Sequence, residues 1–347
     1  MNRRNGTIIV VILVVLSISI VYFSIARSTD VSAFNTIRIG YFPNLNHAQA
    51  MVGIARGTFE QASGDNIKVE YKIFNAGPSV IEALFTDQID IAYTGPSPAI
   101  TGYMRSNQDL KIIAGSSSGG VAFIVRSDMN IESPSDFAGK RFASPQYGNT
   151  QDISLKWYLV NHGYSLAQYG GNVQVLSAKN SDIMTLFLKK ELDGAWVPEP
   201  WAALLVKNAN GQIFLDERDL WTDGEFATTL LVVNSKFLQN HPDLVKKVIM
   251  AHVETTLWIK EQPDQAEQII NEHLKKLFGK PLPSDVMHES FSRIKVTYNP
   301  MKPSVMKFAD EASELGLYGD EKPDLSDIYY AELLNEVLRE KELSLVE

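Results

Sequence analysis

The chain has 347 residues, of which 45% are hydrophobic and 21% are charged, so it can bury a large core and falls in the ordinary globular class. Its formal net charge of −9 and its lack of any Lys/Arg cluster exclude nucleic acid as an expected partner, because phosphate binding needs a basic face. The sequence contains no cysteine, which removes disulfides, thiolate metal sites and cysteine nucleophiles.

The N-terminal segment differs in character from the rest of the chain. Two arginines precede an uncharged apolar run from Thr7 to Ile25, which approaches the length that a helix needs to span a bilayer. We expect residues 1–30 to form an uncleaved signal or anchor helix in the cell membrane, with the positive flank in the cytoplasm and the remainder outside. The alternative is cleavage after Ala26, which would leave a secreted or periplasmic protein. Because the sequence has no cysteine, no lipid can be attached through a cysteine side chain.

Strand-like and helix-like segments alternate from Ile37 onward, which is typical of an α/β fold with a parallel sheet flanked by helices. The first set has expected strands at 37–42, 67–74, 89–95 and 110–117 and helices at 48–59, 79–85 and 99–104. The pattern then restarts, with strands at 123–128, 140–145, 173–178, 192–198 and 212–216 and helices at 152–161, 182–190 and 200–208. This repetition predicts two α/β lobes.

One more strand is expected at 228–237, and the chain after it is almost purely helical. With no strand left to pair, these helices should pack back on the first lobe. The predicted domains are therefore lobe I at 36–117 plus 229–347 and lobe II at 118–228, with two crossings between them. The Ser-Ser-Ser-Gly-Gly run at 116–120 suits a hinge, because small residues absorb backbone rotation at low steric cost, although an ordinary turn has the same composition.

In an open α/β sheet, ligands bind beyond the carboxyl ends of the strands, where helix N-termini point. This rule selects a set of loops rich in Gly, Ser, Thr and Asn and almost free of Lys and Arg, namely 43–47, 75–79, 93–97, 116–118, 145–151 and 197–201. Backbone N–H groups, hydroxyl groups and helix dipoles in such loops can hold a small oxyanion without a buried countercharge. Any one of these loops could equally be an ordinary helix cap. The prediction of an anion-binding site therefore depends on the loops meeting at one cleft.

The segment Gly194 to Leu205 contains two tryptophans that bracket Glu199 just after a strand. The aromatic faces of Trp196 and Trp201 could cover an organic tail at the cleft mouth, or both could belong to the core. Glu199 could bind an amine, cap the following helix or bridge the lobes. His47 is placed at a helix start, where it could donate to an anion or serve as a neutral cap.

Motifs for catalysis are missing from the sequence. None of the six histidines lies in an HExxH pattern, and neither a Walker-type loop nor a GxGxxG fingerprint occurs. We therefore expect a binding protein without a cofactor or metal rather than an enzyme, while a triad assembled only in space stays open.

The order of these segments resembles the ABC-importer solute-binding proteins for aliphatic sulfonates, taurine and nitrate, from about Ile37 to Tyr318. The phrases that carry the resemblance are FNAGPSVIEALFTDQIDIAYTGPSPAI, GKRFASPQYGNTQDISLKWYLVNHGY, LDGAWVPEPWAALL and TTLLVVNSKFLQNHPDLVKKV. The resemblance implies a type II periplasmic-binding-protein fold, closure of two lobes over the solute, and delivery to transmembrane permease subunits with separate ATPase subunits. The lipobox cysteine of lipid-anchored relatives is not present here.

The predicted ligand-binding residues come from both arguments. The resemblance places contacts on Gly77, Pro78, Thr94, Gly95, Ser116, Ser117, Gly148, Asn149, Thr150, Gln151 and Trp196. The strand-end rule selects most of the same loops and adds Asn46, His47 and Glu199.

The expected solute is a small anion, with an aliphatic sulfonate first and taurine, nitrate, bicarbonate or a thiamine precursor as alternatives. We expect a monomer. An enzyme on a related fold, as in thiamine-pyrimidine synthesis, is the alternative from a different class; fungal members of that branch carry a cysteine-rich motif that this chain lacks. A sensor domain that reports the solute to another membrane protein is a third possibility.

Overall fold

The computed structural model describes residues 35–319 and 322–346. Among these residues, no helix combines the length and the apolar composition that a membrane span requires. The anchor helix expected at residues 1–30 lies outside the described residues.

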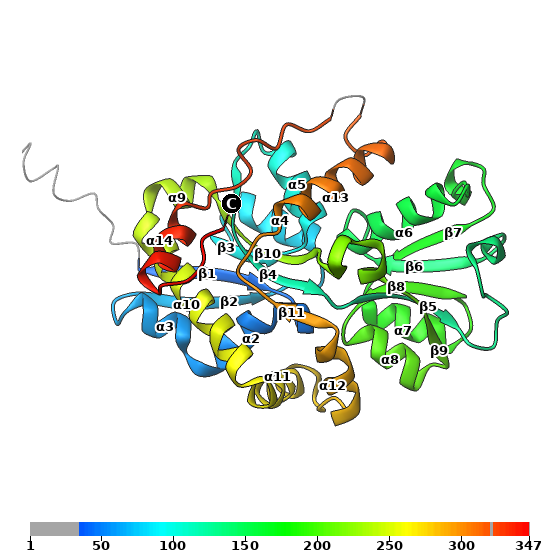
Figure 1. The fold of residues 1–347 in the computed structure, drawn as a ribbon, viewed down its shortest axis with the longest axis horizontal. Helices are drawn as coiled ribbons and strands as arrows, with labels where there is room; N and C mark the ends of the chain where they lie inside the picture. Colours follow the sequence, from blue (N-terminus) through cyan, green and yellow to red (C-terminus); the bar gives the residue numbers. More distant parts are fainter. Residues whose placement is uncertain (1–34, 320–321, 347) are drawn as a thin grey trace, which may run out of the picture. The chain divides into compact units, whose positions relative to one another are not determined.

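Two sheets form the centres of two lobes (Figure 1). Sheet A has the strand order β11-β4-β10-β3-β1-β2 and builds the half that we call lobe I. Its strands are β1 (Thr36–Tyr41), β2 (Lys68–Ile73), β3 (Ile91–Thr94), β4 (Leu110–Gly119), β10 (Ala227–Asn234) and β11 (Ile294–Val296). Sheet B has the order β7-β6-β8-β5-β9 and builds the half that we call lobe II. Its strands are β5 (Val121–Arg126), β6 (Arg141–Pro145), β7 (Gln174–Ala178), β8 (Gly194–Pro198) and β9 (Gly211–Asp216).

Helices cover both faces of each sheet. Those of the first half are η1 (Leu45–His47), α2 (Ala48–Arg56), α3 (Thr58–Ser63), α4 (Gly77–Phe85) and α5 (Pro96–Arg105). Those that follow β5 are η2 (Pro134–Phe137), α6 (Thr150–Asn161), η3 (Ala167–Tyr169), α7 (Asn180–Leu188), α8 (Trp201–Asn208), η4 (Glu217–Leu220) and η5 (Thr222–Gly224). The C-terminal part contributes α9 (Ser235–Asn240), α10 (Pro242–Glu261), α11 (Pro263–Phe278), α12 (Ser284–Ser292), α13 (Lys302–Glu314) and α14 (Glu332–Glu340). Figure 1 shows α4, α5 and α13 on one side of sheet A and α2 and α11 on the other.

The strand arrangement differs in three ways from the sequence prediction. Strand β5 runs antiparallel to both of its neighbours, β8 and β9. Strand β10 runs antiparallel to both β3 and β4, and β11 pairs antiparallel with β4 where only helices were expected. The expectation that no strand follows residue 237 was wrong because β11 has three residues, too few for an alternating pattern to be visible in the sequence. β11 takes its position by pairing with β4, a strand far from it in the sequence.

The chain passes between the two sheets at two places, between β4 and β5 and between β9 and β10. The central strands of both sheets are fully buried, as expected for strands that are covered on two faces. In lobe II, the rings of Phe123 and Trp196 stack with centroids 5.2 Å apart, and Phe142 meets Phe123 edge-on. Two rigid lobes with two connecting segments therefore position the loops at the facing ends of the sheets.

Candidate functional site

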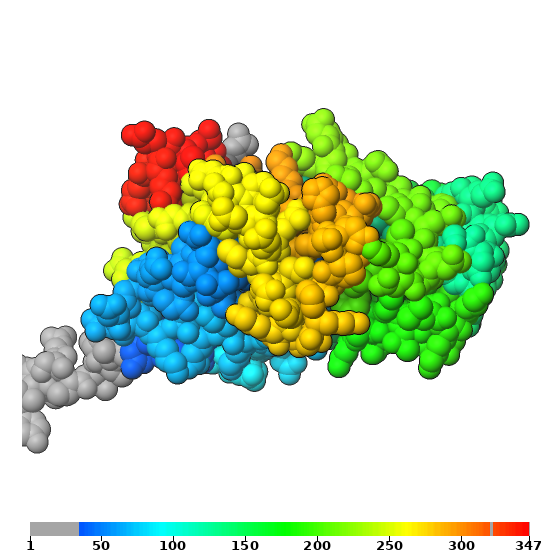
Figure 2. Space-filling view, turned by 90° about the horizontal axis from the view of Figure 1, so that it is seen from below, coloured from blue at the N-terminus to red at the C-terminus, as the bar shows by residue number. Residues whose placement is uncertain are grey.

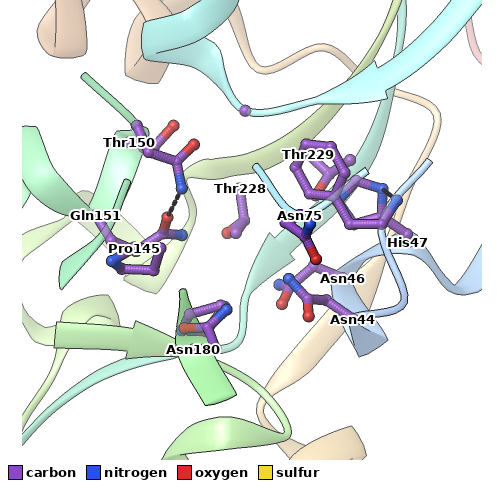
Figure 3. Close-up of a pocket in the computed structure, with 14 residues that line it drawn as sticks. Asn44, Asn46, His47, Asn75, Pro145, Thr150, Gln151, Asn180, Thr228 and Thr229 are labelled. Atoms are coloured by element: carbon purple, nitrogen blue, oxygen red, sulfur yellow. Dashed lines mark hydrogen bonds between the residues drawn. The ribbon is translucent and has the colours of Figure 1, made fainter. Parts of the chain in front are cut away.

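A small pocket lies between the two lobes and is lined by loops from both (Figure 3). The cavity volume is ≈ 20 Å³, about the room that one water molecule needs. Lobe I supplies Phe42, Asn44, Asn46, His47, Asn75, Gly95, Thr228 and Thr229, and lobe II supplies Pro145, Asn149, Thr150, Gln151, Asn180 and Pro198.

The lining is polar but uncharged. Asparagine, glutamine, threonine and histidine provide its polar groups, and no Asp, Glu, Lys or Arg from the described part of the chain contributes. Three helices begin at the pocket: Gly95 precedes α5, Asn149 precedes α6, and Asn180 is the first residue of α7. No side chain caps these helix starts. The first turns of α6 and α7 therefore offer N–H groups and positive dipole ends to a negatively charged guest, whereas α5 begins with Pro96 and Pro98, which have no N–H, and contributes mainly its dipole end.

His47 is held as a neutral donor. The Phe42 N–H donates to Nδ1 of His47 at 3.3 Å, and the two rings lie 4.3 Å apart. Complete burial lowers the pKa of His47 to about 3. Because Nδ1 accepts, the single ring proton is on Nε2, which can donate to an oxyanion at any ordinary pH.

The loop before α6 is held in place by Asp152. Its Oδ1 accepts from the hydroxyl of Ser144 at 2.9 Å, and its Oδ2 accepts from the Gly148 N–H at 2.9 Å. Lys156, one turn later, contacts the same carboxylate at 2.6 Å. This buried pair is neutral as a whole, so Lys156 supports the loop and brings no net charge to the pocket.

Contacts between the lobes enclose the pocket. The indole N–H of Trp201 in lobe II donates to Oδ1 of Asn44 in lobe I at 3.3 Å, and the Leu45 N–H donates to the carbonyl of Glu199 at 3.2 Å. A Cβ at Gly95 would lie 2.3 Å from Oγ1 of Thr150, so only glycine permits this approach of α5 to α6. The two lobes are therefore in direct contact around the pocket.

Comparison with known proteins gives the family. The NMT1-like family matches residues 32–272, which is more than half of the chain. The chain belongs to the NMT1-like family.

Relatives and structural neighbours of the chain include proteins named for small solutes. The taurine-binding periplasmic protein of Escherichia coli (strain K12) is 25% identical over 229 residues, which cover 63% of this chain and 68% of that protein. The alkanesulfonate-binding protein SsuA from Xanthomonas axonopodis pv. citri, bound to MOPS, has a TM-score of 0.69 at 17% identity and covers 85% of this chain and 98% of its own. The nitrate-binding protein NrtA from Synechocystis PCC 6803 has a TM-score of 0.76 at 15% identity, covering 89% and 90%. The predicted resemblance to ABC-importer solute-binding proteins and the periplasmic-binding-protein fold are confirmed.

The structure brings six of the predicted site residues together on the lining. They are Asn46, His47, Gly95, Asn149, Thr150 and Gln151. Pro78 and Gly148 instead line a neighbouring, more apolar cavity beside α4 and α5. Gly77 packs against Pro98, and Thr94 is buried at the end of β3, next to the pocket but not on its lining.

Four other predicted residues are buried away from the pocket lining of this NMT1-like fold. Ser116 and Ser117 are buried in β4, where the Ser116 hydroxyl donates to Gln49 at 2.9 Å. Trp196 is fully buried in lobe II and donates from its indole N–H to Glu217 at 2.6 Å, so it belongs to the core and not to the lining. Glu199 is also fully buried: Oε2 accepts from the Ala203 N–H, and Oε1 contacts Arg293 at 2.6 Å.

Four lining residues lie outside the loops that the sequence selected, and one of them, Phe42, directly precedes the loop 43–47. Asn180 follows β7 at the start of α7, so the strand-end rule could have found it. Thr228 and Thr229 lie at the amino end of β10, which reaches the same edge only because β10 is antiparallel to its neighbours. No local signal in the sequence shows that direction.

Proposed function

We propose that this chain is the solute-binding subunit of an ABC importer and that it captures a small organic anion, an aliphatic sulfonate first, between its two lobes. The observation that carries the proposal is the meeting of three uncapped helix N-termini from both lobes at one uncharged polar pocket. An oxyanion is the guest that such a site favours, because N–H dipoles stabilise negative charge. The names of the relatives and neighbours, which specify taurine, alkanesulfonate and nitrate, support an anionic solute.

Neutral donors suit a protein that must release its cargo. Each hydrogen bond contributes on the order of 1 kcal/mol net, so several can bind a solute reversibly. Opening about the two connecting segments would separate the Thr150 side of the pocket from the His47 side. In the proposed cycle, the solute closes the lobes, the closed form docks on the permease outside the cytoplasm, and opening releases the solute. The protein acts as a monomer and remains tethered to the membrane by residues 1–30.

A thermal-shift screen of the purified chain tests the solute class. We expect an aliphatic sulfonate to raise the melting temperature, with taurine, nitrate, bicarbonate and thiamine precursors as the comparison set. A ligand at about 100 times its Kd adds about 2.7 kcal/mol of stability, which such a screen detects. A folded protein that none of the anions stabilises would contradict the proposed function.

The proposal contains no chemical step. The pocket offers one neutral histidine, whose Nδ1 already accepts from Phe42, and no carboxylate on its described lining. A bound solute should therefore be recovered unchanged after long incubation. Any conversion detected by mass spectrometry would favour the enzyme alternative.

A further inference from the structure

The orientation of the Asn46 side chain can be decided from its partner. Nδ2 of Asn46 lies 2.9 Å from the carbonyl oxygen of Gly119, which can only accept a hydrogen bond. The amide nitrogen is therefore committed to Gly119, and Oδ1 is the atom left for another partner. Asn46 is 2% exposed, and Oδ1 has no hydrogen-bond partner among the described residues.

Asn180 contributes a second side-chain amide from the other lobe, and no hydrogen bond within the described residues engages that amide. Asn180 is 8% exposed, and its Oδ1 is also buried without a partner in the described part of the chain. Both side chains line the pocket, and Figure 3 shows them on its two sides. A buried amide oxygen is normally hydrogen-bonded, and leaving one unpaired is costly. Two such acceptors at one pocket indicate that the guest supplies donors.

Other side chains of the pocket present donors. Nε2–H of His47 is one, because Nδ1 accepts from Phe42. Asn44 is another: the indole N–H of Trp201 can only donate, so Oδ1 of Asn44 accepts it and Nδ2 is the group that Asn44 can offer. The pocket therefore combines donors and helix N-termini for an oxyanion with two amide oxygens for a donor group.

We propose that the solute carries a hydrogen-bond donor, an ammonium or hydroxyl group, a short distance from its oxyanion, and that Asn46 and Asn180 recognise this group. The inference rests on the proposed function, since it concerns the same guest. Glu199, the carboxylate that the sequence suggested for an amine, is paired with Arg293 and the Ala203 N–H. Neutral amide oxygens take its place, and an ammonium would have its charge balanced by the oxyanion of the same molecule.

Three sulfonates of nearly equal size separate the possibilities in calorimetry on the full chain. Ethanesulfonate has no donor group, 2-hydroxyethanesulfonate has a hydroxyl, and taurine has an ammonium. We expect at least one donor-bearing sulfonate to bind about tenfold or more tightly than ethanesulfonate. Equal or tighter binding of ethanesulfonate would overturn the inference, because water would then satisfy the two oxygens.

Two substitutions of Asn180 test the assignment to residues. Asn180→Leu should reduce the preference for the donor-bearing sulfonate to less than about threefold, mainly by weakening that ligand. Asn180→Asp, which suits the first turn of a helix, should shift the preference toward taurine and away from the hydroxyl compound. Thermal melting confirms that each variant is folded. An unchanged preference in both folded variants would contradict the role of Asn180.

Asn46→Ala provides the matching test in lobe I. Because this substitution also removes the hydrogen bond to the Gly119 carbonyl, thermal melting must confirm that the variant is folded. The outcomes for the two proposals are distinguishable. If nitrate or ethanesulfonate binds and the donor-bearing sulfonates have no advantage, anion capture stands and the donor-group inference falls. If no anion of either panel binds the folded chain, the proposed function fails, and this inference fails with it.

Discussion

At the scale of single residues, the pocket depends on polar groups that are neutral or neutralised. Burial keeps His47 uncharged, and Lys156 lies against the carboxylate of Asp152. Thr150 is the first residue of α6, 3% exposed, and its hydroxyl has no partner among the described residues. This hydroxyl lies against Gly95 on the pocket lining, where a solute held between the lobes would meet it.

Thr150→Val should weaken solute binding about five- to tenfold, since one hydrogen bond contributes on the order of 1 kcal/mol. The unliganded fold should be unaffected, because the hydroxyl has no partner in the described protein to lose. Isothermal titration calorimetry measures the affinity. Thr185→Val, on the exposed face of α7, is the matched control and should bind as the wild type does. Equal solute affinities for the two variants would show that the solute does not contact the N-terminus of α6.

Two buried carboxylates meet near the contact of α13 with α6. Glu217 accepts from the indole N–H of Trp196 and from the Ser154 hydroxyl, while Glu311 has Lys307 at 3.8 Å. Burial raises the pKa of Glu217 to about 7, and burial together with Glu217 raises that of Glu311 to about 8. In the unfolded chain both would ionise near 4.5. The folded state therefore holds more protons between these values, and stability falls as the pH rises from about 4.5 to 8.

Glu311→Gln should remove part of this pH dependence, because the amide keeps the shape of the side chain but cannot ionise. Between pH 5 and 8.5, we expect the free energy of unfolding of the variant to fall by on the order of 1–2 kcal/mol less than that of the wild type. Urea unfolding at the two pH values measures the difference. Glu191→Gln, at an exposed carboxylate after α7, is the control. Parallel pH profiles for wild type and Glu311→Gln would show that Glu311 is ionised in the folded protein.

At the scale of elements, the turn between β4 and β5 links the two lobes and the pocket. Gly119 and Gly120 both have positive φ, +73° and +71°. The carbonyl of Gly119 accepts from Nδ2 of Asn46 and from the Thr228 hydroxyl, so three separate segments join at this point. A Cβ at Gly120 would lie 2.4 Å from Ile294 and 2.8 Å from Nδ2 of Asn46.

Gly120→Ala should both destabilise the protein and weaken binding. The left-handed backbone alone costs an alanine about 1–2 kcal/mol, and the contacts with Ile294 and Asn46 should add about 1–3 kcal/mol. Gly139→Ala separates the two effects, because Gly139 has a φ of +75° with open space around it. Chemical unfolding and calorimetry on both variants measure them. If Gly139→Ala lost as much stability and solute affinity as Gly120→Ala, packing at the turn would be unimportant.

At the scale of the whole molecule, C-terminal segments tie lobe I to lobe II. Helix α12 packs against α8, and Figure 2 shows the orange C-terminal segment beside the green surface of lobe II. Arg293, at the end of α12, forms an ion pair with Glu199, and Lys207 of α8 pairs with Asp285 of α12. On the pocket side, the hydrogen bond from Trp201 to Asn44 completes the closure.

Trp201→Phe tests whether that closure contributes to binding. The ring is kept, but the indole N–H that bridges the lobes is lost, so the closed form should be less favourable by on the order of 1 kcal/mol and solute affinity should fall about three- to tenfold. Calorimetry measures the affinity, and small-angle scattering follows closure by added solute. Trp258→Phe, in α10 of lobe I, is the control. Wild-type affinity in Trp201→Phe would mean that this contact does not limit closure.

Much of the fold was visible in the sequence because strands and helices have local periodicities. The alternation from Ile37 onward predicted two α/β lobes, and the strand-end rule selected Asn46, His47 and the loop before α6 from the residue types that follow each strand. Strand direction has no local signature, which is why the antiparallel β10 and its two threonines were not recognised as part of the site.

The sequence by itself determined the two-lobed α/β plan, the uncharged polar character of the site and the family, because these depend on composition, periodicity and motif order along the chain. Only the tertiary structure decided which polar residues share one pocket. It assigned Trp196 to the core and Glu199 to an ion pair with Arg293, and it brought Asn180 opposite Asn46. The physical reason is that burial and hydrogen-bond partners come from segments far apart in the sequence, so a side chain's role depends on neighbours that its local pattern does not contain.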